Sequence, residues 1–171
     1  QWSRPVLGGA ASSANVFNTV TSTGGKLTLQ NGTNIFNSFG PSSMYVNQTG
    51  GTAFLGSYAN NVSMNYGYYG LAGGALINGN LANSYGYWLF SKTGVSVMDM
   101  SGGTFTCGSG GGGVSMVLAA GSSSTGVLYQ TGGTITVPKS SAALFVMSEG
   151  ALYSPARAEM TIAGGNDTMA G

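Results

Sequence analysis

Apolar, small and polar residues recur in a fixed order along the chain, and adjacent glycine pairs mark each recurrence. A large, mostly apolar residue stands four positions before the first glycine of each pair, and a small residue stands immediately before it. After the pair, apolar and polar residues alternate, as Leu27 and Leu29 do with Lys26 and Thr28. Alternation with a period of two predicts a β-strand with one buried face.

Six glycine pairs define the repeat. The corner glycines are Gly24, Gly50, Gly73, Gly102, Gly132 and Gly164, which by subtraction lie 23 to 32 residues apart. The predicted core positions four residues before them are Val20, Val46, Tyr69, Met98, Leu128 and Met160. Those three residues after them include Leu27, Leu76, Phe105 and Ile135. A period of this length is typical of stacked repeat proteins.

Positions are counted from the first glycine of each pair. The residues expected to point inward lie at even distances before this glycine and at odd distances after it. A bend there would restore the alternation, and glycine adopts the backbone angles that such a corner needs. Turn-rich segments at 78–80, 108–113 and 121–126 separate the apolar runs, and no window has sustained helical periodicity. We therefore expect an all-β fold, a single-chain β-solenoid (β-helix) of about six coils with glycine-pair corners. An antiparallel sandwich is the alternative, because short strands with turn signals suit it too.

The chain of 171 residues is most simply one domain, 1–171, because each coil buries its apolar face only against its neighbours. We expect residues 1–16 to form an N-terminal cap or a segment that crosses to a neighbouring subunit. Because the sequence starts at Gln1, we expect either that a leader has been removed or that it is part of a longer protein.

Charged residues are scarce. Five Lys and Arg, four Asp and Glu, and no His give a formal net charge of +1. Nucleic-acid binding has no support without a basic patch, and no run reaches the roughly 18 apolar residues of a membrane span. Low charge with abundant Gly, Ser, Thr and Asn is typical of extracellular surface and fibre proteins, so we expect a secreted, cell-surface location.

The few acidic residues do not form a catalytic set. Asp99 and Glu159 occupy different repeat positions, and Glu149, Arg157 and Glu159 form the one local charge cluster, which we interpret as a surface ion pair. The lack of histidine excludes Ser-His-Asp triads and histidine-containing zinc sites, and one cysteine excludes all-cysteine sites. We therefore predict no enzymatic activity, no cofactor and no metal. Cys107 is interpreted as a buried thiol, with a disulfide between subunits as the alternative.

Residues 45–52, 98–106 and 128–137 (YVNQTGGT, MDMSGGTFT and LYQTGGTITV) resemble one kind of known repeat. They are similar to the glycine-rich β-strand repeats of bacterial autotransporter passengers and related large surface proteins. The resemblance implies a β-helix, secretion, and a role in adhesion, surface coating or fibre assembly, and it supplies no catalytic residue. Residues 164–171 are also similar to one copy of the calcium-binding β-roll nonapeptide, although such sites need consecutive copies. The other interpretation is a degenerate last repeat with Asp167 at an inward position.

Two surface features could bind ligands without catalysis. Threonines fall in two columns that resemble those of ice-binding proteins: Thr52, Thr104 and Thr134 in one, and Thr28, Thr106, Thr136 and Thr168 in the other, with Phe54, Ala75 and Ile77 interrupting them. Aromatic residues crowd the middle of the chain and could stack on sugars or pack on another subunit: Tyr58, Tyr66, Tyr68, Tyr69, Tyr85, Tyr87, Trp88 and Phe90. Tyr69 and Trp88 are expected in the core.

The two ends of a solenoid expose unpaired strand edges, which soluble solenoids usually cap. Here residues 162–169 continue the repeat register without a cap, so we expect either that the chain continues beyond them or that copies add end to end. We expect an assembly interface that joins copies head to tail, made of Trp2, Val6, Leu7, Ile162 and Met169. The expected function is an extracellular structural subunit of a surface fibre or filament. The alternatives are a monomeric adhesin or carbohydrate-binding passenger module, an ice-binding protein and a polysaccharide-active enzyme. The expected partners are further copies of the chain and glycans.

Overall fold

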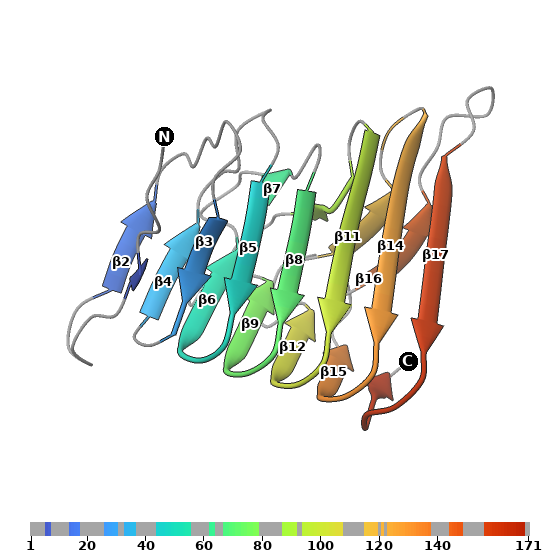
Figure 1. Cartoon of the computed structure of the whole chain (residues 1–171). Coiled ribbons are helices and arrows are strands. Elements are labelled where there is room, and N and C mark those ends of the chain that lie inside the picture. Colours follow the sequence, from blue (N-terminus) through green and yellow to red (C-terminus); the bar gives the residue numbers. More distant parts are fainter. Residues whose placement is uncertain are drawn as a thin grey trace.

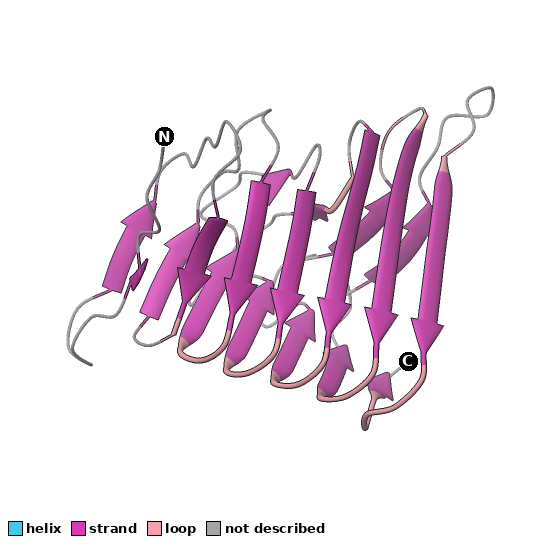
Figure 2. Ribbon diagram, in the orientation of Figure 1, coloured by secondary structure: helices cyan, strands magenta, loops and turns pink. Residues whose placement is uncertain are grey.

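A computed structural model of the chain describes residues 6–7, 14–17, 26–30, 33–36, 44–55, 62–63, 67–78, 87–91, 94–107, 115–119, 121, 123–137, 144–148 and 156–169. The elements in these ranges are all β-strands, and every strand pair among them is parallel (Figure 1; Figure 2). The all-β prediction is confirmed, and the antiparallel sandwich is excluded for this part of the chain.

The strands form three sheets. Sheet A contains, in spatial order, β1 (Val6–Leu7), β3 (Lys26–Leu29), β5 (Met44–Gln48), β8 (Gly67–Leu71), β11 (Gly94–Met100), β14 (Ser124–Gln130) and β17 (Arg157–Ile162). Sheet B contains β2 (Ala14–Phe17), β4 (Thr33–Phe36), β6 (Thr52–Leu55), β9 (Ala75–Asn78), β12 (Thr104–Cys107), β15 (Thr134–Val137) and β18 (Thr168–Met169). Sheet C contains β7 (Val62–Ser63), β10 (Tyr87–Leu89), β13 (Ser115–Ala119) and β16 (Leu144–Ser148).

Spatial neighbours in each sheet come from successive repeats, so each repeat adds one level to a stack. Figure 1 shows the sheet-A strands as a row in chain order, with tight turns leading from β5, β8, β11 and β14 to the sheet-B strands of the same levels. One such turn links Met100, the last residue of β11, to Thr104, the first of β12. This parallel, level-by-level arrangement is compatible with a β-solenoid.

The structure corrects the assignment of the first repeat. The pattern placed Leu27 after the Gly24 corner, in register with Ala53, but Leu27 pairs with Val46 in sheet A. Because Leu29 pairs with Gln48 and Thr33 with Thr52, residues 30–32 separate β3 from β4 as residues 49–51 separate β5 from β6. In the sequence, Asn-Gly at 31–32 stands where the later repeat has Gly50-Gly51, so the glycine-pair pattern does not include it. Gly24 and Val20 lie outside the described residues.

With the corrected register, the stack contains one more level than the six glycine pairs suggested. Strands β1 and β2 precede β3 and β4 in their sheets, so sheets A and B each contain seven strands where the glycine pairs suggested about six coils. Parts of the predicted N-terminal segment 1–16 therefore pair with the chain's own ladder.

The core is formed by columns of inward residues, aligned from level to level. Fully buried residues at the predicted positions are Val46, Tyr69, Met98, Leu128, Leu76, Phe105 and Ile135. Leu27 and Met160, nearer the two ends of the stack, are only partly buried and pack against this cluster. Burial of each such side chain contributes about 1.5–3 kcal/mol. An apolar side chain is covered when a level lies on each side of it, so stacking creates the core.

The two glycines of a corner meet different demands. At Gly102, a Cβ atom would lie 2.5 Å from the carbonyl oxygen of Ala72 in the preceding corner. At Gly103, φ is +73°, a conformation that strains any residue with a side chain. Close approach recurs at Gly50, Gly73, Gly132 and Gly164, and positive φ recurs at Gly51, Gly74, Gly133 and Gly165. Glycine pairs mark the repeat because stacked corners impose both demands on adjacent residues.

We expect Gly103→Ala to lower the free energy of unfolding by at least about 1–2 kcal/mol, because alanine is strained at this φ and its Cβ would press on the Gly74 carbonyl. The control is Ser101→Ala, an exposed position in the same loop, which should change it by less than about 0.5 kcal/mol. Urea unfolding of both variants measures the difference, and equal midpoints would contradict the account of the corner.

Candidate functional site

Apolar residues are exposed at the C-terminal end of the described stack. Ile162 of β17 is 49 % exposed, although Leu71, Met100 and Gln130 in the same column are fully buried. Figure 1 shows β17 and the short β18 at one end of the row, opposite β2. Strand β17 ends the order of sheet A, so its outer edge has no partner strand in the described part of the chain. Its backbone N–H and C=O groups are available to another strand.

Asp167 closes the inward column of sheet B at this end. Its column contains Ile135 at the level below, as the pairing of Thr136 with Thr168 fixes. The Oδ1 atom of Asp167 accepts hydrogen bonds from the Ile135 backbone N–H at 3.0 Å and from Nε2 of Gln130 at 2.8 Å. The interpretation of Asp167 as the inward residue of a degenerate repeat is confirmed. This carboxylate satisfies the Ile135 N–H, while the outer edge of β17 stays without a partner strand in the described part of the chain.

Gln48 shows how a buried amide is satisfied inside the stack. Its Oε1 accepts from the Tyr69 hydroxyl at 2.7 Å, and its Nε2 donates to the Ala75 carbonyl at 2.9 Å. Burial raises the pKa of Tyr69, so its hydroxyl remains a donor. Both partners belong to the next level, so this buried amide links two levels.

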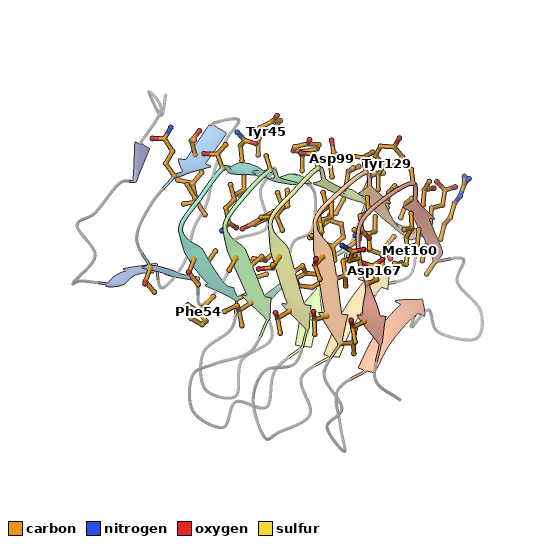
Figure 3. All side chains as sticks on the ribbon, turned by 90° about the horizontal axis from the view of Figure 1, so that it is seen from below. Tyr45, Phe54, Asp99, Tyr129, Met160 and Asp167 are labelled. Carbon is orange, nitrogen blue, oxygen red and sulfur yellow. The ribbon has the colours of Figure 1, made fainter. Side chains whose placement is uncertain are left out.

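Gln130 lies in the same column as Gln48, but only one of its two side-chain amide atoms has a hydrogen-bond partner among the described residues. Nε2 donates to Asp167, whereas the buried Oε1 has no hydrogen-bond partner among the described residues. The residue that corresponds to Tyr69 at the next level is Met160, whose thioether has no proton to donate. A buried acceptor without a donor costs about 1–3 kcal/mol. Figure 3 labels Met160 and Asp167, which both lie at this end of the stack.

Arg157 and Glu159 form an exposed ion pair on β17. The predicted surface ion pair is thus confirmed for these two residues, while Glu149 lies outside the described residues. Exposed pairs contribute little stability, so the charges matter chiefly as solvated groups beside the open edge.

A second surface lies on the outer face of sheet A. The rings of Tyr45 and Tyr68 stack with centroids 4.7 Å apart and planes at 19°, and the Tyr68 hydroxyl donates to Asp99 at 2.8 Å. Burial, together with the Asp99 hydrogen bond, raises the pKa of Tyr68 to about 12, so it stays protonated at neutral pH. A Cβ atom at Gly70 would lie 2.9 Å from the Tyr68 ring, so glycine makes room for the ring. Tyr45 and Tyr129 are 41 % and 43 % exposed.

The sequence indicated only part of this surface. Tyr68 belonged to the predicted aromatic cluster, but Tyr45 and the link to Asp99 were missed. Both tyrosines stand five residues before a glycine pair, which is a signal that could have joined them. From the same cluster, Tyr69 and Phe90 are fully buried and Tyr87 and Trp88 lie on β10. Tyr58, Tyr66 and Tyr85 are outside the described residues.

The threonine columns need one correction. Thr104 pairs with Thr134, and Thr106, Thr136 and Thr168 are aligned, as predicted. Thr28, however, pairs with Asn47 in sheet A, because the first corner was misassigned. Ala75 and Ile77 separate the remaining threonines from the N-terminal levels.

The predicted assembly residues lie at opposite ends of the stack. Val6 and Leu7 form β1, whereas Ile162 ends β17 and Met169 ends β18. Trp2 is outside the described residues. Cys107 ends β12, aligned with Asn78. The structure therefore presents the predicted interface as two separate surfaces.

Within the described ranges, no group of three or more His, Cys, Asp and Glu side chains could hold a metal ion. In that same part of the chain, no helix has the length and apolarity to cross a membrane. No family model, curated protein or solved structure matches the chain. Its function must therefore be argued from its own geometry.

We expect Met160→Tyr to be more stable than Met160→Phe by about 1 kcal/mol, because only tyrosine can supply the hydroxyl that Gln130 Oε1 lacks. The two aromatic variants differ only in that hydroxyl, so each is the other's control for ring size. Chemical unfolding measures the difference. If the phenylalanine variant were as stable as the tyrosine variant, the inferred deficit at Gln130 would be wrong.

Proposed function

We propose that the chain is a β-solenoid that acts as a non-enzymatic structural subunit of an extracellular fibre or filament. Copies add end to end, so that the ladder of one continues into the next. The observation that carries the proposal is the parallel ladder of sheets A and B, which ends in β17 and β18 without a further strand in the described part of the chain.

A parallel ladder makes its two ends complementary. Every strand of sheet A runs in the same direction, so β1 of a second copy can pair with β17 without any reversal. Such a contact joins two different surfaces and does not close on itself, which produces linear assemblies. With seven levels at a strand spacing of about 4.8 Å, each subunit adds roughly 34 Å to the filament.

Apolar surface favours the same contact. Ile162 is half exposed at one end, and Val6 and Leu7 form the first strand of the same sheet at the other. Docking would cover Ile162 with a further level, as Met100 and Leu71 are covered within the stack. The hydrophobic effect therefore acts together with backbone pairing.

Low charge and the resemblance to autotransporter repeats support the proposed extracellular location. Lys and Arg together with Asp and Glu make up 5 % of the residues. Mutual repulsion between copies is therefore weak, as an assembly of many identical subunits requires.

Negative-stain electron microscopy of dilute protein tests the assembly. We expect linear filaments, and we expect Ile162→Lys to stop their growth because lysine at a strand edge opposes further pairing. The control is Val95→Lys, which places the same charge at a residue 54 % exposed on the outer face of sheet A and should leave filaments intact. Discrete particles of wild-type protein at every concentration would contradict the proposal.

Glycan binding is a second candidate, favoured by the surface around Tyr45, Tyr68 and Asp99. Stacked rings offer an apolar contact for the C–H face of a sugar, and a neighbouring carboxylate accepts from hydroxyls. We expect saturable binding to soluble glycans that Tyr45→Ala weakens by about tenfold, while Val95→Ala leaves it unchanged. Equal binding by the two variants would exclude this surface.

A further inference from the structure

One column of aligned residues in sheet B changes from apolar to polar at the two ends of the stack. Strand register aligns the residues Asn15, Asn34, Ala53, Leu76, Phe105, Ile135 and Asp167 in one column. The middle four are fully buried and apolar. Both ends of this column carry polar residues, an amide at the N-terminal end and a carboxylate at the C-terminal end.

The neighbouring columns of aligned residues have apolar residue types at both ends. In sheet A, the column that ends at Ile162 begins at Leu7. In sheet B, Phe17 begins the column of Leu55, and Met169 ends the column of Val137. If a second copy continued the same register, apolar residues of the two copies would lie side by side in these columns. In the column of Asp167, polar residues of the two copies would lie side by side.

We infer that copies join in this one register, with Asp167 of one copy beside Asn15 of the next and Ile162 beside Leu7. The inference rests on the proposed end-to-end assembly and adds its register. Both hydrogen bonds to Asp167 within the described residues go to Oδ1. Its side chain is exposed, and Oδ2 can accept a hydrogen bond from the Asn15 amide of the incoming copy.

The pairing of Asp167 with Asn15 also disfavours other registers between copies. A shift of one residue would turn every inward residue of the incoming strand to the outside. A shift of two that places Asp167 beside Phe17 would set a carboxylate next to an aromatic residue, which has no N–H or O–H group to offer Oδ2. Backbone pairing alone would tolerate either shift, so the polar pair supplies the specificity that the ladder lacks.

A residue exchange in the full chain tests the register. Asn15→Asp places two carboxylates on adjacent levels at the junction, and we expect it to raise the critical concentration for filaments at least about tenfold. The double variant Asn15→Asp/Asp167→Asn exchanges the two groups and should bring that concentration back to within about threefold of wild type. Thermal unfolding of each variant checks that folding is intact.

The outcomes separate the two proposals. If wild type forms filaments and Asn15→Asp does so equally well, the register is wrong while end-to-end assembly stands. Failure of the double variant to recover also overturns the register. If wild-type protein forms no filaments at all, both proposals fall.

Cross-linking provides a second readout that does not depend on the charge pair. In a Cys107→Ser background, Leu7→Cys mixed with Ile162→Cys should form a disulfide between copies, because strand spacing of about 4.8 Å lies within disulfide range. Neither variant alone should form that bond. Filaments that contain both variants but no such disulfide would overturn the register.

Discussion

Backbone pairing between successive levels is the constraint on which the rest of the structure depends. It sets a spacing of about 4.8 Å, at which corner lies on corner and column on column. The close approach of Gly102 to the Ala72 carbonyl and the positive φ of Gly103 both follow from it. The buried columns follow as well, because a residue such as Met98 is covered by Tyr69 and Leu128 on the two sides.

The same constraint makes polar groups in the stack depend on neighbouring levels. Gln48 is satisfied because Tyr69 and Ala75 of the next level supply its partners. Gln130 lies near the end of the stack, where Asp167 serves one of its amide atoms and Met160 leaves the other without a donor. The last described level is therefore neither fully capped nor paired with a further described strand. This partial closure leaves sheet A open while it places a carboxylate in sheet B.

Much of the fold could be predicted from the sequence because corners and columns constrain residue types directly. Leu128 and Ile135 stand at fixed offsets from a glycine pair, and both are fully buried. The first repeat was assigned wrongly because the sequence between β3 and β4 contains Asn-Gly instead of two glycines. Contacts across levels could not be predicted from spacing alone, such as the hydrogen bond from Tyr68 to Asp99. The need for glycine at position 126 could not be predicted from spacing either, because it arises from a contact with another sheet. A Cβ atom at Gly126 would lie 1.8 Å from the Leu118 carbonyl oxygen.

The central claim is that successive repeats stack in register along one axis. Spin labels on cysteines replacing Thr104 and Thr134, in a Cys107→Ser background, test it by electron paramagnetic resonance. These residues are direct partners, so the account predicts a separation of one strand spacing, about 4.8 Å between backbones, and strong dipolar broadening. Labels at Thr52 and Thr134, three levels apart, should lie about 14 Å apart and broaden far less. Weaker coupling in the Thr104–Thr134 pair than in the Thr52–Thr134 pair would contradict the stacked register.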